Sequence, residues 1–453
     1  MRKKRTDAEQ QVAELLRTAK ESLGLSVAFL TRMDGTTQTL EVVETSIPLL
    51  FQDGATQPQE STFCQAILDG RLPAVIPDVG ALPVAKRLPA ARFPRIRSYV
   101  SVPVTLSDGS LYGTFCAAAL TTDKGLTKRD QSLMNVLASA AAVIIEPGVR
   151  EAERVRAIRH RLDPLMAAGG PTVVLQPIVS LRTGERIGAE ALSRFPSDWG
   201  MAPDVCFEEA HSVGRGARLE LQALERAARL LEQVSGYVAM NVSPQTLLDP
   251  ECQTLFGRLD AKRLLIELSE HDPVEDYEEL SAALAPLRAK GAKLAIDDVG
   301  AGFSSLRHIV LTSPDVIKID RSIAAGLATD PVLHTLVRAL VQFAHGSGAT
   351  VVAEGIETED DALALRELDV DSGQGWLFGR PGTVEALLAT ATWRPAHAQT
   401  HGRAHDHTQT HDQTQANDQV QAASTPAIPR SRQATDHLPT VEAVDNSTQV
   451  RPL

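Results

Sequence analysis

The sequence predicts two folded domains of different class, an α+β domain and then an eight-stranded βα barrel, followed by a disordered tail. Residues up to about 146 mix strand-like and helix-like segments, whereas residues from about 168 to 392 alternate short apolar strands with amphipathic helices. Residues 396–453 contain no Phe, Trp or Tyr. The length of 453 residues suits two or three domains of about 100–200 residues each. The 43% apolar fraction is enough to build sizeable cores.

Composition excludes several classes of protein. A net charge of −12 argues against a nucleic-acid polymer as partner, because a broad phosphate surface needs basic residues to neutralise it. No run approaches 18 apolar residues, and the basic N-terminus lacks an apolar stretch, so we expect neither a spanning helix, a signal peptide nor a membrane partner. The four scattered cysteines lack a Cys-x-x-Cys pair. We therefore expect reduced thiols in a cytoplasmic protein.

The first domain, residues 1–146, is predicted to consist of a helix, then antiparallel strands, then a closing helix. Helices are expected over residues 8–22 and 127–145, the second with Asp130 in an incomplete capping box at Thr127. Strands are expected over residues 26–30 and 39–43, joined at Asp34-Gly35, and over residues 99–106 and 111–117, joined at Asp108-Gly109. This pattern predicts a sheet with one covered face.

A helical linker is predicted over residues 147–168, after a break at Pro147-Gly148. Val155, Ile158 and Leu162 form one narrow apolar stripe on a segment otherwise rich in Arg. A solvated connector packed on its neighbours and a lever between the two domains both fit this pattern.

In the second domain, residues 169–392, a polar side chain stands at or near the end of each successive apolar strand. The members are Glu190, Asn241, Glu267, Asp297 with Asp298, Lys318, Glu354 and Gln374. Their spacings of 20 to 51 residues bracket the roughly 31 residues of one βα unit in an eight-fold barrel. With a first strand over residues 173–179, the predicted strands number eight. The carboxyl ends of barrel strands share one mouth, where barrel enzymes keep their active sites.

The side-chain types at this mouth favour a hard cation. Carboxylate and amide oxygens without His or Cys select Mg²⁺ or Mn²⁺ over zinc or copper. Adjacent Asp297 and Asp298 can reach two ions if the strand becomes irregular there. Two ions about 3.5–4 Å apart suit phosphodiester hydrolysis, and Lys318 can stabilise developing negative charge beside them.

The first domain resembles a GAF sensory domain. The resemblance rests on Ser61-Thr-Phe-Cys-Gln65, Pro77-Asp78, Ser98-Tyr-Val-Ser-Val-Pro103 and the stretch from Asp108-Gly109 to Cys116. It implies a small ligand whose identity the sequence does not give. Some relatives attach a bilin to a Cys that precedes His, but Gln65 follows Cys64, so no covalent chromophore is expected. Cys64 and Cys116 are expected to be small buried residues rather than redox sensors.

The second domain resembles EAL domains, the cyclic diguanylate phosphodiesterases. The motifs, in order, are Gln176-Pro-Ile178, Glu190-Ala-Leu192 with Arg194, Asn241-Val-Ser243, Glu267-Leu-Ser-Glu270, the Asp297–Leu306 segment, Lys318-Ile-Asp320, Ala353-Glu-Gly-Ile-Glu357 and Gln374-Gly-Trp-Leu-Phe-Gly-Arg-Pro381. This resemblance implies a modified triosephosphate-isomerase-type barrel whose first strand runs antiparallel. It also implies hydrolysis of cyclic diguanylate to linear pGpG with two Mg²⁺ or Mn²⁺ ions.

The EAL resemblance further implies a role for each site residue. Metal ligands would be Glu190, Asn241, Glu267, Asp297 and Asp298, with Asp297 bridging. Lys318 and Glu354 would position and activate water, and Glu270 would brace the loop after the Asp pair. Substrate contacts would come from Gln176, Leu192, Arg194 and Gln374.

Three positions depart from the EAL pattern, and two other functions were weighed. Val299 replaces an aromatic residue, Ala301 a common Thr, and Ser269 a Thr; none of these removes a ligand or the base. The alternatives are a receptor that binds the dinucleotide without hydrolysing it, and a scaffold for protein contacts. Surplus apolar residues on the 127–145 helix also predict a homodimer.

The tail, residues 396–453, is rich in His, Gln, Thr and Asp and is predicted to be disordered, because it cannot bury enough apolar surface. Its histidines could in principle capture a transition metal, but a polar low-complexity tail is the simpler interpretation.

Overall fold

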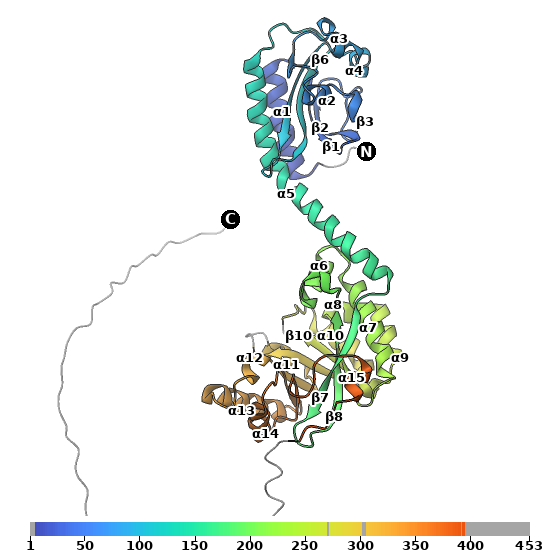
Figure 1. Cartoon of the computed structure of the whole chain (residues 1–453), viewed down its shortest axis with the longest axis vertical. Helices are drawn as coiled ribbons and strands as arrows, with labels where there is room; N and C mark the ends of the chain where they lie inside the picture. Colours follow the sequence, from blue (N-terminus) through green and yellow to red (C-terminus); the bar gives the residue numbers. More distant parts are fainter. Residues whose placement is uncertain (1–4, 270, 301–304, 391, 395–453) are drawn as a thin grey trace, which may run out of the picture. The chain divides into compact units, whose positions relative to one another are not determined.

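The computed structural model describes residues 5–269, 271–300, 305–390 and 392–394 (Figure 1). The predicted tail lies outside these residues. So do Glu270 and Ala301, two positions that the sequence singled out.

The first domain is built on an antiparallel sheet of six strands in the order β3-β2-β1-β6-β5-β4. Its strands are β1 (Val27–Met33), β2 (Thr37–Thr45), β3 (Thr56–Pro58), β4 (Val75–Ile76), β5 (Ser98–Thr105) and β6 (Leu111–Ala119). The two predicted hairpins are present, β1 with β2 and β5 with β6. The central pair, β1 with β6, joins segments that lie about 85 residues apart in sequence, such as Phe29 and Cys116.

Helices cover both faces of this sheet, so the prediction of a single covered face was wrong. Helices α1 (Asp7–Leu23) and α5 (Lys128–Ala167) pack side by side on one face (Figure 1). The opposite face packs against short helices α2 (Phe63–Leu68), α3 (Pro83–Arg87) and α4 (Pro89–Arg92), with 3₁₀ turns η1 (Gln59–Ser61) and η2 (Val79–Ala81) nearby. The reason lies in β1, where Ala28 and Leu30 face one core and Val27 and Phe29 the other. A strand that is apolar on both faces needs cover on both.

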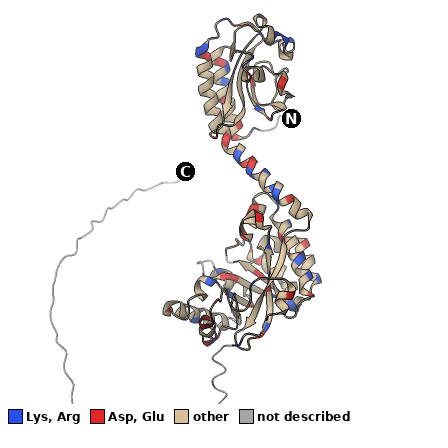
Figure 2. Ribbon diagram, viewed as in Figure 1, with Lys and Arg blue, Asp and Glu red and all other residues tan. Residues whose placement is uncertain are grey.

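Helix α5 runs without a break through Pro147-Gly148, where the sequence had predicted an interruption. It begins at a complete capping box. The Thr127 N–H donates to the Asp130 carboxylate, and the Arg129 N–H donates to the Thr127 hydroxyl. Arg150, which follows the proline, forms an ion pair across it with Glu146 at 3.2 Å and a second ion pair with Asp108 at 2.9 Å. Blue and red segments accordingly alternate along this part of α5 in Figure 2. These pairs help the helix to continue where Pro147 offers no backbone N–H.

By length and composition alone, α5 is also long and apolar enough to cross a membrane. That feature was not expected from the sequence. Met134, Leu137 and Ala141 of this helix are buried against the sheet of the first domain.

The end of α5 packs on the helices that precede the third barrel strand. Ile158 and Leu162 are buried together with residues of α6 (Pro203–Ser212) and α7 (Gly216–Leu231), among them Ala210 and Leu219. The predicted apolar stripe therefore makes a packed connection.

The second domain is a closed barrel of eight strands in the order β10-β11-β12-β13-β14-β7-β8-β9, as predicted. The strands are β7 (Thr172–Ser180), β8 (Arg186–Arg194), β9 (Tyr237–Asn241), β10 (Leu264–Ser269), β11 (Lys293–Val299), β12 (Val316–Ile319), β13 (Thr350–Ala353) and β14 (Ser372–Gln374). Strand β7 pairs antiparallel with both β8 and β14, and the other pairs are parallel. The expected antiparallel first strand is thus confirmed.

Further helices surround the barrel: α8 (Pro244–Leu247), α9 (Pro250–Arg258), α10 (Tyr277–Ala289), α11 (Ser305–Thr312), α12 (Arg321–Ala324), α13 (Pro331–Gly346), α14 (Glu359–Glu367) and α15 (Val384–Leu388), with 3₁₀ turns η3 (Ser197–Trp199) and η4 (Ala261–Arg263). Inside the barrel, Ile178, Ala239, Leu265, Ala295, Val316 and Val352 form a small apolar cluster. On the parallel strands these residues precede the polar positions, and on the antiparallel β7 Ile178 follows Gln176, so the apolar plug lies below the polar mouth and supports it.

Candidate active site

Lys318 stands at the centre of the barrel mouth, fully buried and surrounded by carboxylates. Its Nζ lies 2.6 Å from Glu354 Oε1, 3.0 Å from Asp297 Oδ2 and 3.1 Å from Glu267 Oε2. Glu190 Oε1 is 3.7 Å away. Four strands and the residue after β13 thus deliver one ammonium and four carboxylates to a single point. A fully buried ammonium is stable only with such compensation.

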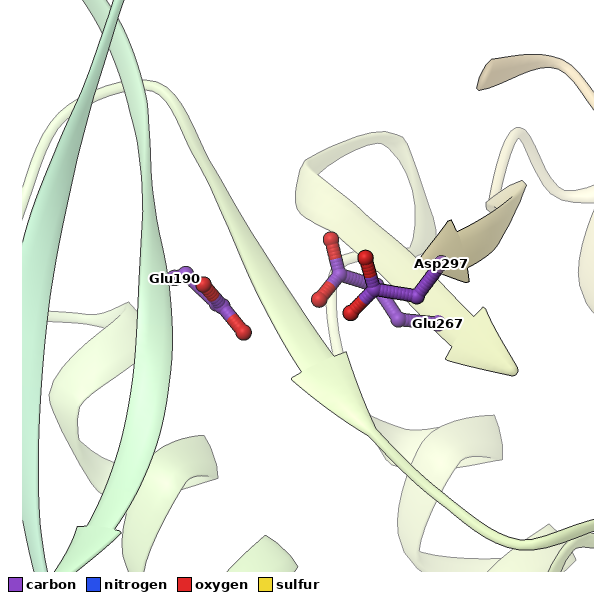
Figure 3. A group of neighbouring side chains, drawn as sticks. All are labelled: Glu190, Glu267 and Asp297. Atoms are coloured by element: carbon purple, nitrogen blue, oxygen red, sulfur yellow. The ribbon is translucent and has the colours of Figure 1, made fainter. Parts of the chain in front are cut away.

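Three of these carboxylates converge from separate strands. Figure 3 shows Glu190 on β8, Glu267 on β10 and Asp297 on β11 directed into the same space. Glu267 is fully buried, and its Oε1 has no hydrogen-bond partner. A buried carboxylate oxygen without a donor is costly, so this atom is available to a cation.

An irregularity in β11 brings both members of the Asp pair to the mouth. The register of β11 with β12 shifts between Ile296 and Val299, and Asp298 has a φ of 60°. Successive residues of a regular strand point to opposite faces, but a bulge re-aims one of them. The Asp298 N–H then donates to Asp297 Oδ1 at 2.9 Å. The two adjacent side chains can consequently serve the same site, as the sequence had suggested.

Amide side chains hold the remaining edge of the site. Gln374 donates through Nε2 to Glu190 Oε2 at 2.5 Å and to Gln176 Oε1 at 3.0 Å, and Asn241 donates to Glu190 Oε1 at 2.8 Å. Gln176 in turn donates to the carbonyl of Gly379 at 3.2 Å. Strands β7, β8, β9 and β14 are therefore tied together at the level of Glu190.

Burial and the neighbouring charges shift several pKa values at this site. Burial raises the pKa of Glu267 well above its usual range, although Lys318 opposes the shift. Burial also raises the pKa of Glu354 to about 8 and, with help from Asp297, that of Asp298 to about 6. Burial would lower the pKa of Lys318, but the surrounding carboxylates raise it well above the ordinary value. One ammonium does not balance the carboxylates around it, so the site favours additional positive charge.

The donor set fits a pair of divalent cations. Two groups of carboxylates have ligand atoms within 4.8 Å of one another, Glu190 with Glu267 and Asp297, and Asp297 with Asp298 and Glu354. Asp297 belongs to both groups. All these donors are oxygens, which suits Mg²⁺ or Mn²⁺.

Two cavities open beside this cluster. The smaller, of about 280 Å³, is lined by Gln176, Leu192, Glu354 and Gln374 together with Arg321, Glu357 and Trp376. The larger, of about 630 Å³, includes Leu192, Arg194, Asn241, Glu267 and Asp298. Leu192 lines both cavities, and Arg194 only the larger. Each described residue that the sequence had assigned to the site therefore belongs to the cluster around Lys318 or lines one of these two cavities. Glu270 lies outside the described residues.

Sequence reasoning missed two sets of residues at these cavities. Arg321 packs over Trp376 and pairs with Glu357 at 2.8 Å, and Arg380 lies 4.2 Å from the Trp376 ring centre. Trp376 lies inside the Gln374–Pro381 motif, which was the available signal.

At the larger cavity, His211 pairs with Glu220 at 2.5 Å, and Glu220 accepts from the N–H and hydroxyl of Ser243. No motif linked these two residues, because they come from two helices, α6 and α7.

Comparison with known proteins assigns both domains. Residues 157–381 match the EAL domain family and residues 6–146 match the GAF domain family. An uncharacterized protein of Azorhizobium caulinodans is 34% identical over 233 residues, which make up 47% of this chain and 32% of that protein. PdeD of Escherichia coli K12, named a probable cyclic di-GMP phosphodiesterase, is 31% identical over 217 residues. These residues make up 46% of this chain and 40% of PdeD.

Among solved structures, the manganese and cyclic di-GMP complex of Klebsiella pneumoniae BlrP1 is 30% identical, with a TM-score of 0.43, and the match covers 47% of this chain and 56% of that one. The chain spans about a third of the length of the first curated relatives that it matches. It is a GAF–EAL protein, in which a GAF domain is followed by an EAL domain.

Proposed function

We propose that the barrel hydrolyses cyclic diguanylate to linear pGpG with the help of two divalent cations, Mg²⁺ or Mn²⁺. The observation that carries this proposal is the cluster of Lys318 with Glu190, Glu267, Asp297 and Glu354 at the mouth of an EAL barrel. The names of two relatives, the probable cyclic di-GMP phosphodiesterases PdeD and PdeB of Escherichia coli, support the choice of substrate. Every described ligand position keeps its carboxylate or amide, which favours hydrolysis over binding alone.

One cation would be held by Glu190, Asn241, Glu267 and Asp297, and a second by Asp297 with Asp298. The shared Asp297 and the unpartnered Glu267 Oε1 fit this arrangement. When bound, two such cations supply stabilisation of charge on the phosphoryl oxygens and a more acidic water.

The chain's own side chains would divide the remaining work. Lys318 holds fixed N–H donors toward the reacting centre, where negative charge develops. Glu354, which Lys318 orients, accepts the proton of the attacking water. Hydrolysis to pGpG adds a hydroxyl to phosphorus and breaks the bond to the 3′ oxygen, which takes up a proton. Gln176, Gln374, Leu192 and Arg194 line the two cavities and would position the dinucleotide.

Turnover with different cations tests this proposal. We expect the purified full chain to convert cyclic diguanylate to pGpG in Mg²⁺ or Mn²⁺, to stop in a chelator, and to be inhibited by Ca²⁺, which prefers longer bonds and more ligands. Glu190→Ala and Asp297→Ala should abolish turnover. Equal turnover in chelator and in Mg²⁺ would contradict the use of metal. Tight binding of the dinucleotide without product would favour a receptor instead.

We further propose that the GAF domain regulates the barrel, that it binds a small ligand and that the protein is a homodimer. A cavity of about 180 Å³ in the GAF domain is lined by Phe29, Gln38, Phe63 and Tyr99, among others. Val136 and Val143 of α5 are 67% and 74% exposed and lie seven residues apart, on one face of the helix. A second copy of α5 would bury that face. Mass spectrometry of small molecules that co-purify with the GAF domain would identify the ligand.

A further inference from the structure

Two cysteines of the GAF domain face each other across its core. Cys64 lies in the first turn of α2 and Cys116 in the middle of β6, and their sulfur atoms are 3.4 Å apart. Both are buried, as the sequence predicted. Buried position alone would make them simple packing residues, but the distance between the sulfurs and their polar surroundings indicate another use.

Hydroxyl groups surround this pair. The Tyr99 hydroxyl lies 3.0 Å from Cys64 Sγ, and the hydroxyls of Ser101 and Thr114 each lie 3.2 Å from Cys116 Sγ. All three hydroxyl residues are buried. A cysteine that only fills space needs no polar neighbours. The Thr114 hydroxyl accepts from the Cys116 thiol, and the Tyr99 hydroxyl can donate to a thiolate at Cys64.

The two thiols are not equivalent. Burial alone would raise the pKa of Cys64, but hydrogen bonds from Cys116, Thr114 and Tyr99 lower it to about 7. Burial and the neighbouring Cys64 raise the pKa of Cys116 well above its usual value. The other two cysteines differ from Cys64, since burial raises the pKa of Cys252 to about 12 and also raises that of Cys206.

Cys64 also borders a cavity. It lines the GAF cavity of about 180 Å³, beside Gln38, Phe63 and Tyr99. A water molecule takes up about 30 Å³ in the liquid, so this cavity has room for a small peroxide.

We propose that Cys64 and Cys116 form an oxidisable dithiol site, in which a hydroperoxide converts the two thiols to a disulfide. The Cys64 thiolate attacks the peroxide oxygen, the O–O bond breaks, and Cys64 becomes a sulfenic acid while an alcohol or water leaves. Cys116 then attacks the Cys64 sulfur, forms the S–S bond and releases water. The two thiols lose two electrons and two protons, and the peroxide takes up both. These reaction steps are typical of redox cysteines that lie beside a second, resolving cysteine.

Peptide mapping of the full-length protein tests the site. The reduced protein is treated with one equivalent of hydrogen peroxide, its remaining thiols are alkylated, and the peptides are identified by mass spectrometry. We expect a Cys64–Cys116 linked peptide that a thiol reductant removes, while Cys206 and Cys252 remain alkylated. Persistent free thiols at Cys64 and Cys116 would overturn the proposal. So would oxidation of Cys206 or Cys252 at the same rate, or sulfinic acid at Cys64 without the disulfide.

Variants assign the two roles. In Cys116→Ser, Cys64 should be trapped as a sulfenic acid by a carbon nucleophile such as dimedone, whereas in Cys64→Ser the Cys116 thiol should stay unmodified. Tyr99→Phe keeps the ring but removes the hydroxyl, and should slow oxidation near pH 7 several-fold. Cys252→Ser is the matched control and should oxidise as the unmodified protein does. If a core variant fails to fold, the peptide map of the unmodified protein still decides the outcome.

Discussion

Glu354 is the side chain whose proposed role is most sharply testable, because it lies 2.6 Å from Lys318 and borders the smaller cavity. Glu354→Gln keeps the shape and removes the proton acceptor. We expect turnover of cyclic diguanylate to fall about 100-fold or more, with dinucleotide affinity changed little. The measurement is product formation by chromatography beside calorimetric binding. Glu367→Gln, an exposed position at the end of α14, is the control, and normal hydrolysis by Glu354→Gln would remove the assigned role.

Lys318 is the fully buried positive charge on which four carboxylates converge. Lys318→Met leaves these carboxylates without their counter-charge, and breaking a buried ion pair in this way typically costs about 3–5 kcal/mol. We therefore expect the free energy of unfolding, measured by denaturant titration in chelator, to fall by an amount of that order. Mn²⁺ should restore part of the loss, since it binds the same oxygens. Equal stability of the variant and the unmodified protein in chelator would contradict this account of the cluster.

The junction of α6 and α7 contains a pH-dependent contact. The hydrogen bond that His211 donates to Glu220 raises the pKa of His211. Burial opposes the change at Glu220, but hydrogen bonds from His211 and Ser243 lower the pKa of Glu220. A raised His pKa stabilises the fold below about pH 6.5 and loses that effect as the pH rises through the folded value. The lowered Glu pKa adds stability above about pH 4.5 and loses it on acidification. The pair therefore contributes most between about pH 4.5 and 6.5.

We accordingly expect His211→Asn to lower the melting temperature more at about pH 6 than at about pH 8.5. His345→Asn is the matched control, because the His345–Asp371 pair at 2.9 Å is more exposed to solvent than the His211–Glu220 pair. Its effect at about pH 6 should be smaller, since solvent screens exposed pairs. A melting-temperature difference for His211→Asn that is the same at both pH values would contradict the prediction.

The sequence predicted strands and their polar ends well, because period-two alternation and the positions of single polar residues are local properties. It predicted the eight strands and the grouping of Glu190, Glu267 and Asp297, whereas the antiparallel β7 was implied only by the resemblance to EAL domains. It did not predict the shift of register at Asp298, which depends on how β11 pairs with β12. The His211–Glu220 contact and the Cys64–Cys116 contact join separate elements, so only the tertiary structure brings them together.

The continuity of α5 was also beyond the sequence, since a Pro-Gly pair ordinarily ends a helix. Two domains hold this helix at its two ends, Met134 and Leu137 in the GAF core and Ile158 and Leu162 against the EAL domain. Tertiary packing thus overrides the local preference for a break. A stiff element between two packed ends can transmit rotation, which a flexible tether cannot, so the unbroken helix meets the first requirement of a lever.

The phase of α5 provides the test of regulation in the whole protein. Inserting two residues after Gly148 turns the segments on either side by about 200° relative to each other, whereas inserting seven adds about two full turns and nearly restores the phase. We expect the two-residue insertion to change cyclic diguanylate turnover markedly and the seven-residue insertion to change it much less.

Residues 150–395 should differ in rate from residues 1–395 and should lose the dimer, measured by light scattering, because they lack the exposed Val136 and Val143. If all four chains hydrolyse at one rate and are monomers, the lever and the dimer are both wrong, and α5 only tethers two independent domains.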